Sequence, residues 1–318
     1  MRRNFLRLAA TTLLFAVTRL ALAESYPVNP LRLVVGFPAG GPNDILARVV
    51  GEALAKRLAQ PVVIENIPGA SGNIATEAVV RAAPDGYTLL LVGPANAING
   101  ALFDKLAFNF LQDIAPVAAI AREPLVMVVH PSLAAKTVPE FIAHAKAHPG
   151  KIRMASTGKG SSPHVTGELF KMLTGLNLPV THYAGGGPAL KEMIAGGAEV
   201  MFEPISAAIE PIKSGKLLAL AVTTQMRSEA LAGVAALGDF VPGFEASAVT
   251  GIGVPRNTPA WIVDLLNREI KAALADANNR LAEMGSTVLS GSPADFGTLL
   301  AAETEKWARV IKMSGARP

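Results

Sequence analysis

Residues 31–59 read LRLVVGFPAGGPNDILARVVGEALAKRLA, and the order of residue types in this stretch decides the fold class. The apolar run at 31–35 predicts a β-strand, and the spacing of apolar residues predicts an α-helix over 43–59. The apolar residues that share one face of that helix are Leu46, Val50, Ala53 and Leu54. A loop rich in glycine and proline joins strand to helix. Strand, loop and helix in this order form half of an α/β unit.

The same alternation continues along almost the whole chain. Further strands are predicted at 61–64, 87–92, 125–129, 151–155, 179–182, 199–202, 217–223 and 248–254. Helices are predicted at 73–82, 137–147, 162–173 and from 188, with Ser162 as the N-cap of the third. Thr258-Pro259 and Ser292-Pro293 open two long closing helices. The fold class is therefore α/β with parallel units.

Two domains are expected. The closing helices have no strands of their own in the prediction, so we expect them to pack on the first sheet. The first domain then comprises 24–125 plus 248–318, and 126–247 is inserted as the second. The two strands near Leu125 and Ala248 would connect the domains as a hinge.

The first 23 residues have the pattern of a signal peptide. A basic start, Met1-Arg2-Arg3, precedes an apolar stretch and the small residues Ala21 and Ala23. The start also resembles the twin-arginine export motif, although ordinary export signals often begin with several arginines too. The whole chain has 29 basic and 25 acidic residues; this segment holds 4 arginines and no acid, so the remainder has 25 of each. That balance argues against nucleic-acid binding, and the absence of cysteine excludes thiol catalysis.

Four loops at the predicted carboxyl ends of strands are the candidate site. Their glycines, prolines and hydroxyl residues place backbone N–H groups at helix N-termini, which suits an anion. The same residues also make ordinary tight turns and caps. The candidate ligand-binding residues in these loops are Phe37, Pro38, Ala39, Gly40, Gly41, Asp44, Ser71, Ser156, Thr157, Ser161, Ser162, Tyr183, Gly185 and Gly186.

Three further candidates lie beside the loops. Asn96 follows the 87–92 strand, His164 lies just inside a helix, and Glu203 follows the 199–202 strand. His164 is either an anion donor or a packed helical residue, and Glu203 faces either the ligand or water. Asp44 is either a ligand contact or a partner of the helix dipole. No metal or cofactor is expected.

Enzyme motifs are incomplete. Residues 157–161, TGKGS, resemble the end of a P-loop, but position 153 is Arg153 where that motif needs glycine. Residues 69–73, GASGN, lack the final glycine of a nucleophile elbow.

The ordered set of loop motifs resembles the substrate-binding proteins of tripartite tricarboxylate transporters, the Bug receptor family. The motifs are VVGFPAGGPND at 34–44, NIPGASG at 66–72, AAPDGYTL at 82–89, ASTG at 155–158 with His164, GELF at 167–170, Tyr183 with GPA at 187–189, and GKL at 215–217 with LAVT at 220–223. The resemblance covers nearly all of the chain after residue 23.

The resemblance implies a two-domain, type II-like periplasmic binding protein fold. It further implies a monomeric periplasmic receptor that closes on a small carboxylate and delivers it to a membrane permease. Loops 37–41, 156–162 and 183–186 would hold the carboxylate oxygens directly or through water. The chain departs from the family pattern at four positions. Ile67 stands where the family usually has Arg, and Ser71 where it has Gly; Ala184 stands where it has Lys, and Glu203 where it has Asp.

Two other functions stay open at this point. One is a ligand sensor that signals through a membrane kinase. The other is a serine-type hydrolase on the same fold that uses Ser156 or Ser161 with His164.

Overall fold

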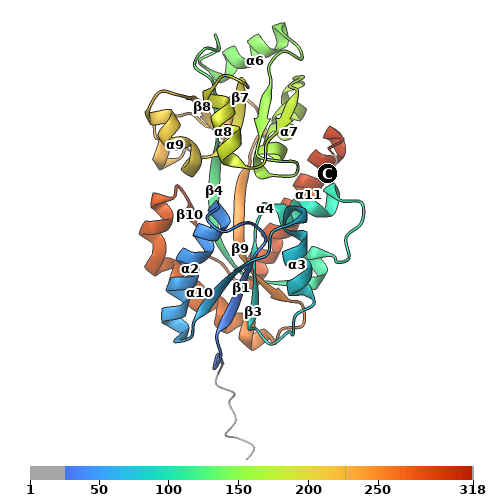
Figure 1. Ribbon diagram of the computed structural model, residues 1–318, viewed down its shortest axis with the longest axis vertical. Coiled ribbons are helices and arrows are strands. Elements are labelled where there is room, and N and C mark those ends of the chain that lie inside the picture. Colours follow the sequence, from blue (N-terminus) through green and yellow to red (C-terminus); the bar gives the residue numbers. More distant parts are fainter. Residues whose placement is uncertain (1–25, 226, 317–318) are drawn as a thin grey trace, which may run out of the picture.

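The computed structural model describes residues 26–225 and 227–316, which form two α/β lobes joined end to end (Figure 1). The predicted signal peptide, residues 1–23, lies outside the described residues. No helix among the described residues is long and apolar enough to span a membrane.

Lobe 1 is built on the sheet order β2-β1-β3-β9-β4. Its strands are β1 (Leu31–Val35), β2 (Val62–Asn66), β3 (Thr88–Val92), the first part of β4 (Ile114–Val129), β9 (Ser247–Pro255) and the short β10 (Thr287–Val288). Its helices are α2 (Pro42–Leu58), α3 (Asn73–Val80), α4 (Pro94–Leu102), α5 (Phe110–Asp113), α10 (Ala260–Glu283) and α11 (Pro293–Ser314). Strand β1 is buried on both faces, with Leu33 against α2 and α10 and Val34 against α3 and α11. This explains why Leu33, Val34 and Val35 are consecutive apolar residues, while Arg32 is exposed.

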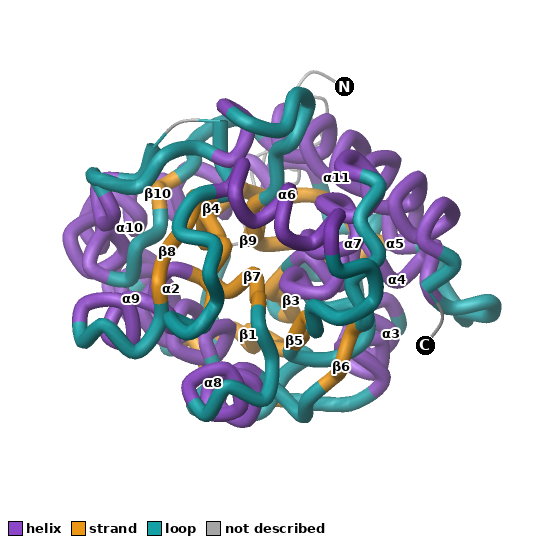
Figure 2. The backbone as a smooth tube through the Cα atoms, turned by 90° about the horizontal axis from the view of Figure 1, so that it is seen from above, coloured by secondary structure: helices purple, strands orange, loops and turns teal. Residues whose placement is uncertain are grey.

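Lobe 2 surrounds the second part of β4. Its strands are β5 (Met154–Ser156), β6 (Val180–His182), β7 (Val200–Pro204) and β8 (Leu218–Val222). Its helices are α6 (Val138–Ala147), α7 (Ser162–Thr174), α8 (Gly186–Ile194) and α9 (Ile205–Lys213). Viewed along the long axis, α6 and α7 lie on one side of these strands and α8 and α9 on the other (Figure 2).

Two adjacent strands, β4 and β9, pass between the lobes. They run antiparallel, and at the crossover Glu123 pairs with Ala248 and Pro124 with Ser247. On the lobe 2 side, the Thr223 Oγ1 accepts a hydrogen bond from the Leu125 N–H at 2.9 Å. That these two strands act as a hinge stays a prediction.

Helix α11 contributes to a core that reaches into both lobes. Its residues Trp307, Val310 and Ile311 are buried in one apolar cluster with Leu102 of α4 and Leu169 of α7. The indole Nε1 of Trp307 donates to Glu303 Oε2 at 2.9 Å, so this buried polar atom is satisfied.

The α/β class is confirmed, but several details of the sequence prediction are wrong. The sheet is mixed, because β9 and β4 pair antiparallel where the chain crosses between the lobes. Strand β4 begins at Ile114 rather than at 125. Helices α4 and α9 were not predicted.

The N-cap of α7 is Ser161 and not Ser162. Ser161 has extended backbone angles, and its hydroxyl accepts a hydrogen bond from the His164 N–H. Ser162 is the first helical residue and Pro163 the second. Either serine satisfies the sequence rule for a cap, so the sequence alone does not separate them.

Candidate functional site

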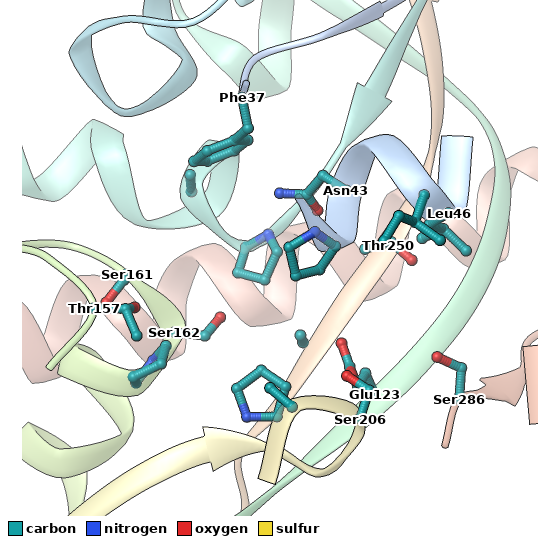
Figure 3. A pocket seen from close by; sticks show the side chains of 18 of the residues that line it. Phe37, Asn43, Leu46, Glu123, Thr157, Ser161, Ser162, Ser206, Thr250 and Ser286 are labelled. Carbon is teal, nitrogen blue, oxygen red and sulfur yellow. The ribbon is translucent and has the colours of Figure 1, made fainter. Parts of the chain in front are cut away.

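A cavity of about 470 Å³ lies between the lobes. Lobe 1 contributes Phe37, the first turn of α2 and the start of α4; lobe 2 contributes the loop after β5 and the first turns of α7 and α9 (Figure 3). The crossing strands close the cavity with Glu123, Ala248 and Thr250. Of the residues expected from the sequence, those that line it are Phe37, Gly40, Thr157, Ser161 and Ser162.

The loop before α2 is held by Asp44. Its carboxylate accepts from the Gly40 N–H at 2.8 Å and forms a two-point ion pair with Arg48. The hydrogen bonds from Arg48 and from Gly40 lower the pKa of Asp44 to about 2. Asp44 is therefore an ionised residue that fixes the loop, and its carboxylate lies away from the cavity lining.

The rest of this loop shapes the cavity wall. The Asn66 side chain donates to the Phe37 carbonyl at 3.0 Å and thereby holds the backbone of Phe37, which lines the cavity. Gly40 has a φ of 79°, which glycine adopts without strain. Pro38 and Ala39 are exposed at the tip of the loop, and Gly41 is the N-cap of α2.

The loop before α7 is held by side-chain hydrogen bonds to its own backbone. Ser161 Oγ donates to the Gly158 carbonyl at 2.7 Å, and the buried Ser156 Oγ donates to the same carbonyl at 3.1 Å. His164 Nδ1 accepts from the Gly160 N–H at 2.9 Å. The hydroxyl of Ser162, one residue past the cap, is among those that line the cavity (Figure 3).

His164 supports the loop and does not face the cavity. Because its Nδ1 accepts a hydrogen bond, the ring is neutral with its proton on Nε2, which lies 3.7 Å from Glu168 Oε1. Burial, together with the charges of His182, Lys171 and Lys159, lowers the pKa of His164 to about 4. The sequence alternative of a packed helical histidine is the one the structure shows.

The loop before α8 does not line the cavity but lies next to a residue that does. The Tyr183 N–H donates to the Ser156 carbonyl at 2.9 Å, and Gly185 has a φ of 114°. A Cβ placed on Gly186 would lie 2.9 Å from Glu203 Oε1 and 3.9 Å from Thr157 Cγ2. Tyr183, Gly185 and Gly186 are therefore positioned by backbone contacts, next to Thr157 of the lining.

Ser71 and Asn96 serve lobe 1 itself. Ser71 has a φ of 54°, and its carbonyl accepts from the Asn99 side chain at 3.0 Å. Asn96 Oδ1 accepts from the Gly93 N–H at 2.8 Å, and its Nδ2 donates to Thr76 Oγ1 at 2.8 Å. Asn96 thus fixes the start of α4, and its neighbours Pro94 and Ala95 line the cavity.

Glu203 is a buried acid at the end of β7. It is 3 % exposed, and its Oε2 has no hydrogen-bond partner among the described residues. Burial first, and then the charge of Glu123, raise the pKa of Glu203 to about 8.

Sequence reasoning missed several polar residues of the lining, namely Asn43, Glu123, Ser206, Thr250 and Ser286. Glu123 lies inside an apolar strand, and Ser206 Oγ donates to its Oε1 (Figure 3). Burial raises the pKa of Glu123. An acid next to an apolar run was the available signal, but the strand was predicted to begin at 125, two residues after Glu123.

The arrangement suits binding better than catalysis. Hydroxyls and the N-termini of α2 and α7 face the cavity, and oriented N–H groups attract an anion. Ser161 and His164 do not form a nucleophile–base pair, because each side chain bonds to the backbone of the loop that precedes Ser161. Among the described residues no group of three or more histidines and acids could hold a metal ion.

Comparisons with known proteins agree with this description. The profile of the tripartite tricarboxylate transporter family receptor matches residues 46–316. Protein BugT of Bordetella pertussis is 35% identical over 300 residues, which span 93% of this chain and 92% of that protein.

Two solved structures of similar sequence carry carboxylates. The Rhodopseudomonas palustris protein Rpa4515 with adipate is 32% identical, with a TM-score of 0.84 over 92% of this chain and 99% of that one. MatC from the same organism, with bound malate, is 31% identical, with a TM-score of 0.79 over 90% of this chain and 100% of that one. From its sequence and its fold alike, this chain belongs to the tripartite tricarboxylate transporter family of receptors.

Proposed function

We propose that this protein is a periplasmic solute-binding protein that holds a small carboxylate between its lobes and delivers it to a membrane permease of the tripartite tricarboxylate type. The observation that carries the proposal is the cavity at the N-termini of α2 and α7, one from each lobe. The carboxylates in the structures of Rpa4515 and MatC support it.

The proposed carboxylate contacts come from both lobes. In lobe 1 they are Phe37, Gly40 and Asn43, and in lobe 2 they are Thr157, Ser161 and Ser162. Hydrogen bonds to a charged group contribute about 1.5–3 kcal/mol each. Five or six of them leave, after the costs of ordering, roughly the 8 kcal/mol of micromolar binding.

The remaining sequence candidates are proposed to act indirectly. Asp44, Ser156 and His164 hold the two lining loops, and Asn96 holds the start of α4. The other residues that support the lining loops are Pro38, Ala39, Gly41, Ser71, Tyr183, Gly185 and Gly186.

Closure is proposed to occur between two domains, 24–125 plus 248–318 and 126–247, about the crossing strands β4 and β9. Ligand would bind one domain first, and contacts from the other would then stabilise the closed state. Residues 1–23 are proposed to export the chain as a signal peptide, and the receptor is proposed to work as a monomer, without a cofactor and without catalysis.

The test is a thermal-shift screen of the purified protein against monocarboxylates, dicarboxylates and tricarboxylates, with neutral sugars as controls. We expect at least one carboxylate to raise the melting temperature in a concentration-dependent way. Stabilisation by sugars alone, with no response to any carboxylate, would contradict the proposal. Substitution of Ser162 by Ala should weaken the response, while the same change at the exposed Ser214 should not.

A further inference from the structure

The cavity has an acidic side that an anion receptor does not require. Glu123 lines it next to Ser206, in the first turn of α9 (Figure 3). The carboxylate of Glu123 accepts from the Ser206 hydroxyl and from the Ser206 backbone. Both donors of Ser206 at this helix N-terminus are thus taken by a carboxylate of the chain itself, and a ligand carboxylate placed here would meet a like charge.

A second acid, Glu203, lies on the neighbouring strand, buried and outside the cavity lining. Glu203 lies on β7, opposite Val126 of the neighbouring β4, and its Oε2 is buried without a partner among the described residues. Its Oε1 lies close to Gly186, beside Thr157 of the cavity wall, and the next residue, Pro204, is itself part of the lining. A buried carboxyl oxygen that lacks a donor is costly unless something else supplies one.

The two acids act on each other. Burial raises the pKa of both, and the charge of Glu123 raises that of Glu203 further. Glu203 is on the face of β7 that packs against α8 and α9, whose charged residues lie farther along these helices: Lys191, Glu192, Glu210 and Lys213. On the opposite face α7 carries His164, Glu168 and Lys171. Among the charged groups around Glu203, it is Glu123 whose charge raises the pKa of Glu203.

We propose that Glu123 and Glu203 form an acidic subsite for the ammonium group of an amino-carboxylate, whose carboxylate lies at the N-termini of α2 and α7. An ammonium group brings three N–H donors and one positive charge, which suit a half-buried carboxylate on the cavity wall and a second, buried acid on the neighbouring strand. A hydroxyl group brings one donor and leaves the negative charge uncompensated. This inference rests on the proposed function and names the class of ligand.

Two matched ligand series test the subsite by titration calorimetry on the purified protein. Succinate, malate and aspartate share a four-carbon skeleton and carry hydrogen, hydroxyl and ammonium at one carbon; glutarate, 2-hydroxyglutarate and glutamate form the five-carbon series. We expect the amino member of one series to bind about tenfold or more tighter than its unsubstituted member. Equal or tighter binding of the unsubstituted or hydroxyl member would overturn the subsite but leave carboxylate binding intact. If no member of either series binds, and no other carboxylate does, the proposed function itself fails.

Proton exchange gives a second readout that needs no variant. At pH 7 a carboxyl with a pKa of about 8 is about nine-tenths protonated. A nearby ammonium lowers that pKa, so binding of the amino-carboxylate should release up to about one proton. Titrations in two buffers of different ionisation enthalpy measure this number. Proton uptake, or no exchange, on binding of the amino member would contradict the subsite.

The variant Glu123→Gln removes the charge while its amide oxygen still accepts from Ser206. It should weaken the amino-carboxylate about tenfold and leave or improve binding of the unsubstituted dicarboxylate. Glu210→Gln is the matched control, because it removes the same charge from an exposed position of α9. Equal losses for both ligand classes in Glu123→Gln would show a merely structural role. Should that variant fail to fold, the proton count of the unaltered protein decides the matter.

Discussion

A single methyl group at Gly160 is expected to push the lobes apart. Gly160, in the loop before α7 of lobe 2, has a φ of 72°. A Cβ placed there would lie 2.3 Å from Leu102 Cδ2 and 3.9 Å from Ile98 Cγ2, both on α4 of lobe 1. Leu102 is 2% exposed, so its end has no free space into which to retreat.

Gly160→Ala should therefore carry two costs. The left-handed backbone costs about 1–2 kcal/mol for a residue with a Cβ. Overpacking against Leu102 costs about 1–3 kcal/mol more. Gly175 provides the matched control, because it has a φ of 68° and a methyl group added there would have no other atom within 4 Å.

Urea denaturation of the two alanine variants measures the difference. We expect Gly160→Ala to lose about 1–3 kcal/mol more free energy of unfolding than Gly175→Ala. Adding Leu102→Ala should recover part of that difference, because it vacates the space that the new methyl needs. Equal losses in the two glycine variants, or no coupling to Leu102, would refute the reasoning about contact between the lobes. Because Gly160 also lines the cavity, its variant should bind the best carboxylate more weakly, whereas the Gly175 variant should not.

Further predictions concern individual side chains. Ser161→Ala should cost about 1 kcal/mol of stability as a lost N-cap, whereas Ser162→Ala should keep its urea midpoint and lose ligand affinity; the reverse would place the cap at Ser162. Asp44, with a pKa of about 2 against an ordinary 3.8, stabilises the fold above about pH 4 and loses this effect as the pH falls towards 2. Asp44→Asn should therefore have a lower melting temperature at neutral pH, and its melting temperature should depend less on pH between 4 and 2. His164, with a pKa of about 4 against 6.5, makes stability fall as the pH drops from about 6.5 to 4, and melts of His164→Asn should show a flatter profile there. Glu203, with a pKa of about 8 against 4.5, makes stability fall as the pH rises from about 4.5 to 8; Glu203→Gln should melt above the unaltered protein at pH 9, and a lower melting point would contradict the burial argument.

The sequence predicted the α/β class and most of the short strands, but it placed some element boundaries poorly. Short apolar runs such as 31–35 are buried on both faces, so they are read correctly from composition alone. The first part of β4 escaped because its alanines, Pro116 and the pair Arg122-Glu123 break the apolar pattern. Helix α4 was not predicted because its asparagines and its glycine are typical of loops. Only the hydrogen bond from the Gly93 N–H to Asn96 shows that Asn96 caps a helix.

The candidate site was predicted as a set of loops, and the structure refines which side chains face the cavity. Gly40 and Thr157 were found because glycines and hydroxyls at helix starts have a physical reason to face an anion. Asp44 and His164 were chosen for the same loops, but their hydrogen bonds to the backbone turn them inward. Glu123 meets Ser206 only through the pairing of distant segments, which no local pattern reveals.

Helix α11 holds the two lobes together along one side of the molecule. The buried indole of Trp307 lies in a core shared with residues of α4 and α7, so parting the lobes along that side would bring a large apolar surface into water. Parting them along the opposite side leaves that core intact. Solute is therefore expected to enter and leave on the side of the molecule that faces away from α11.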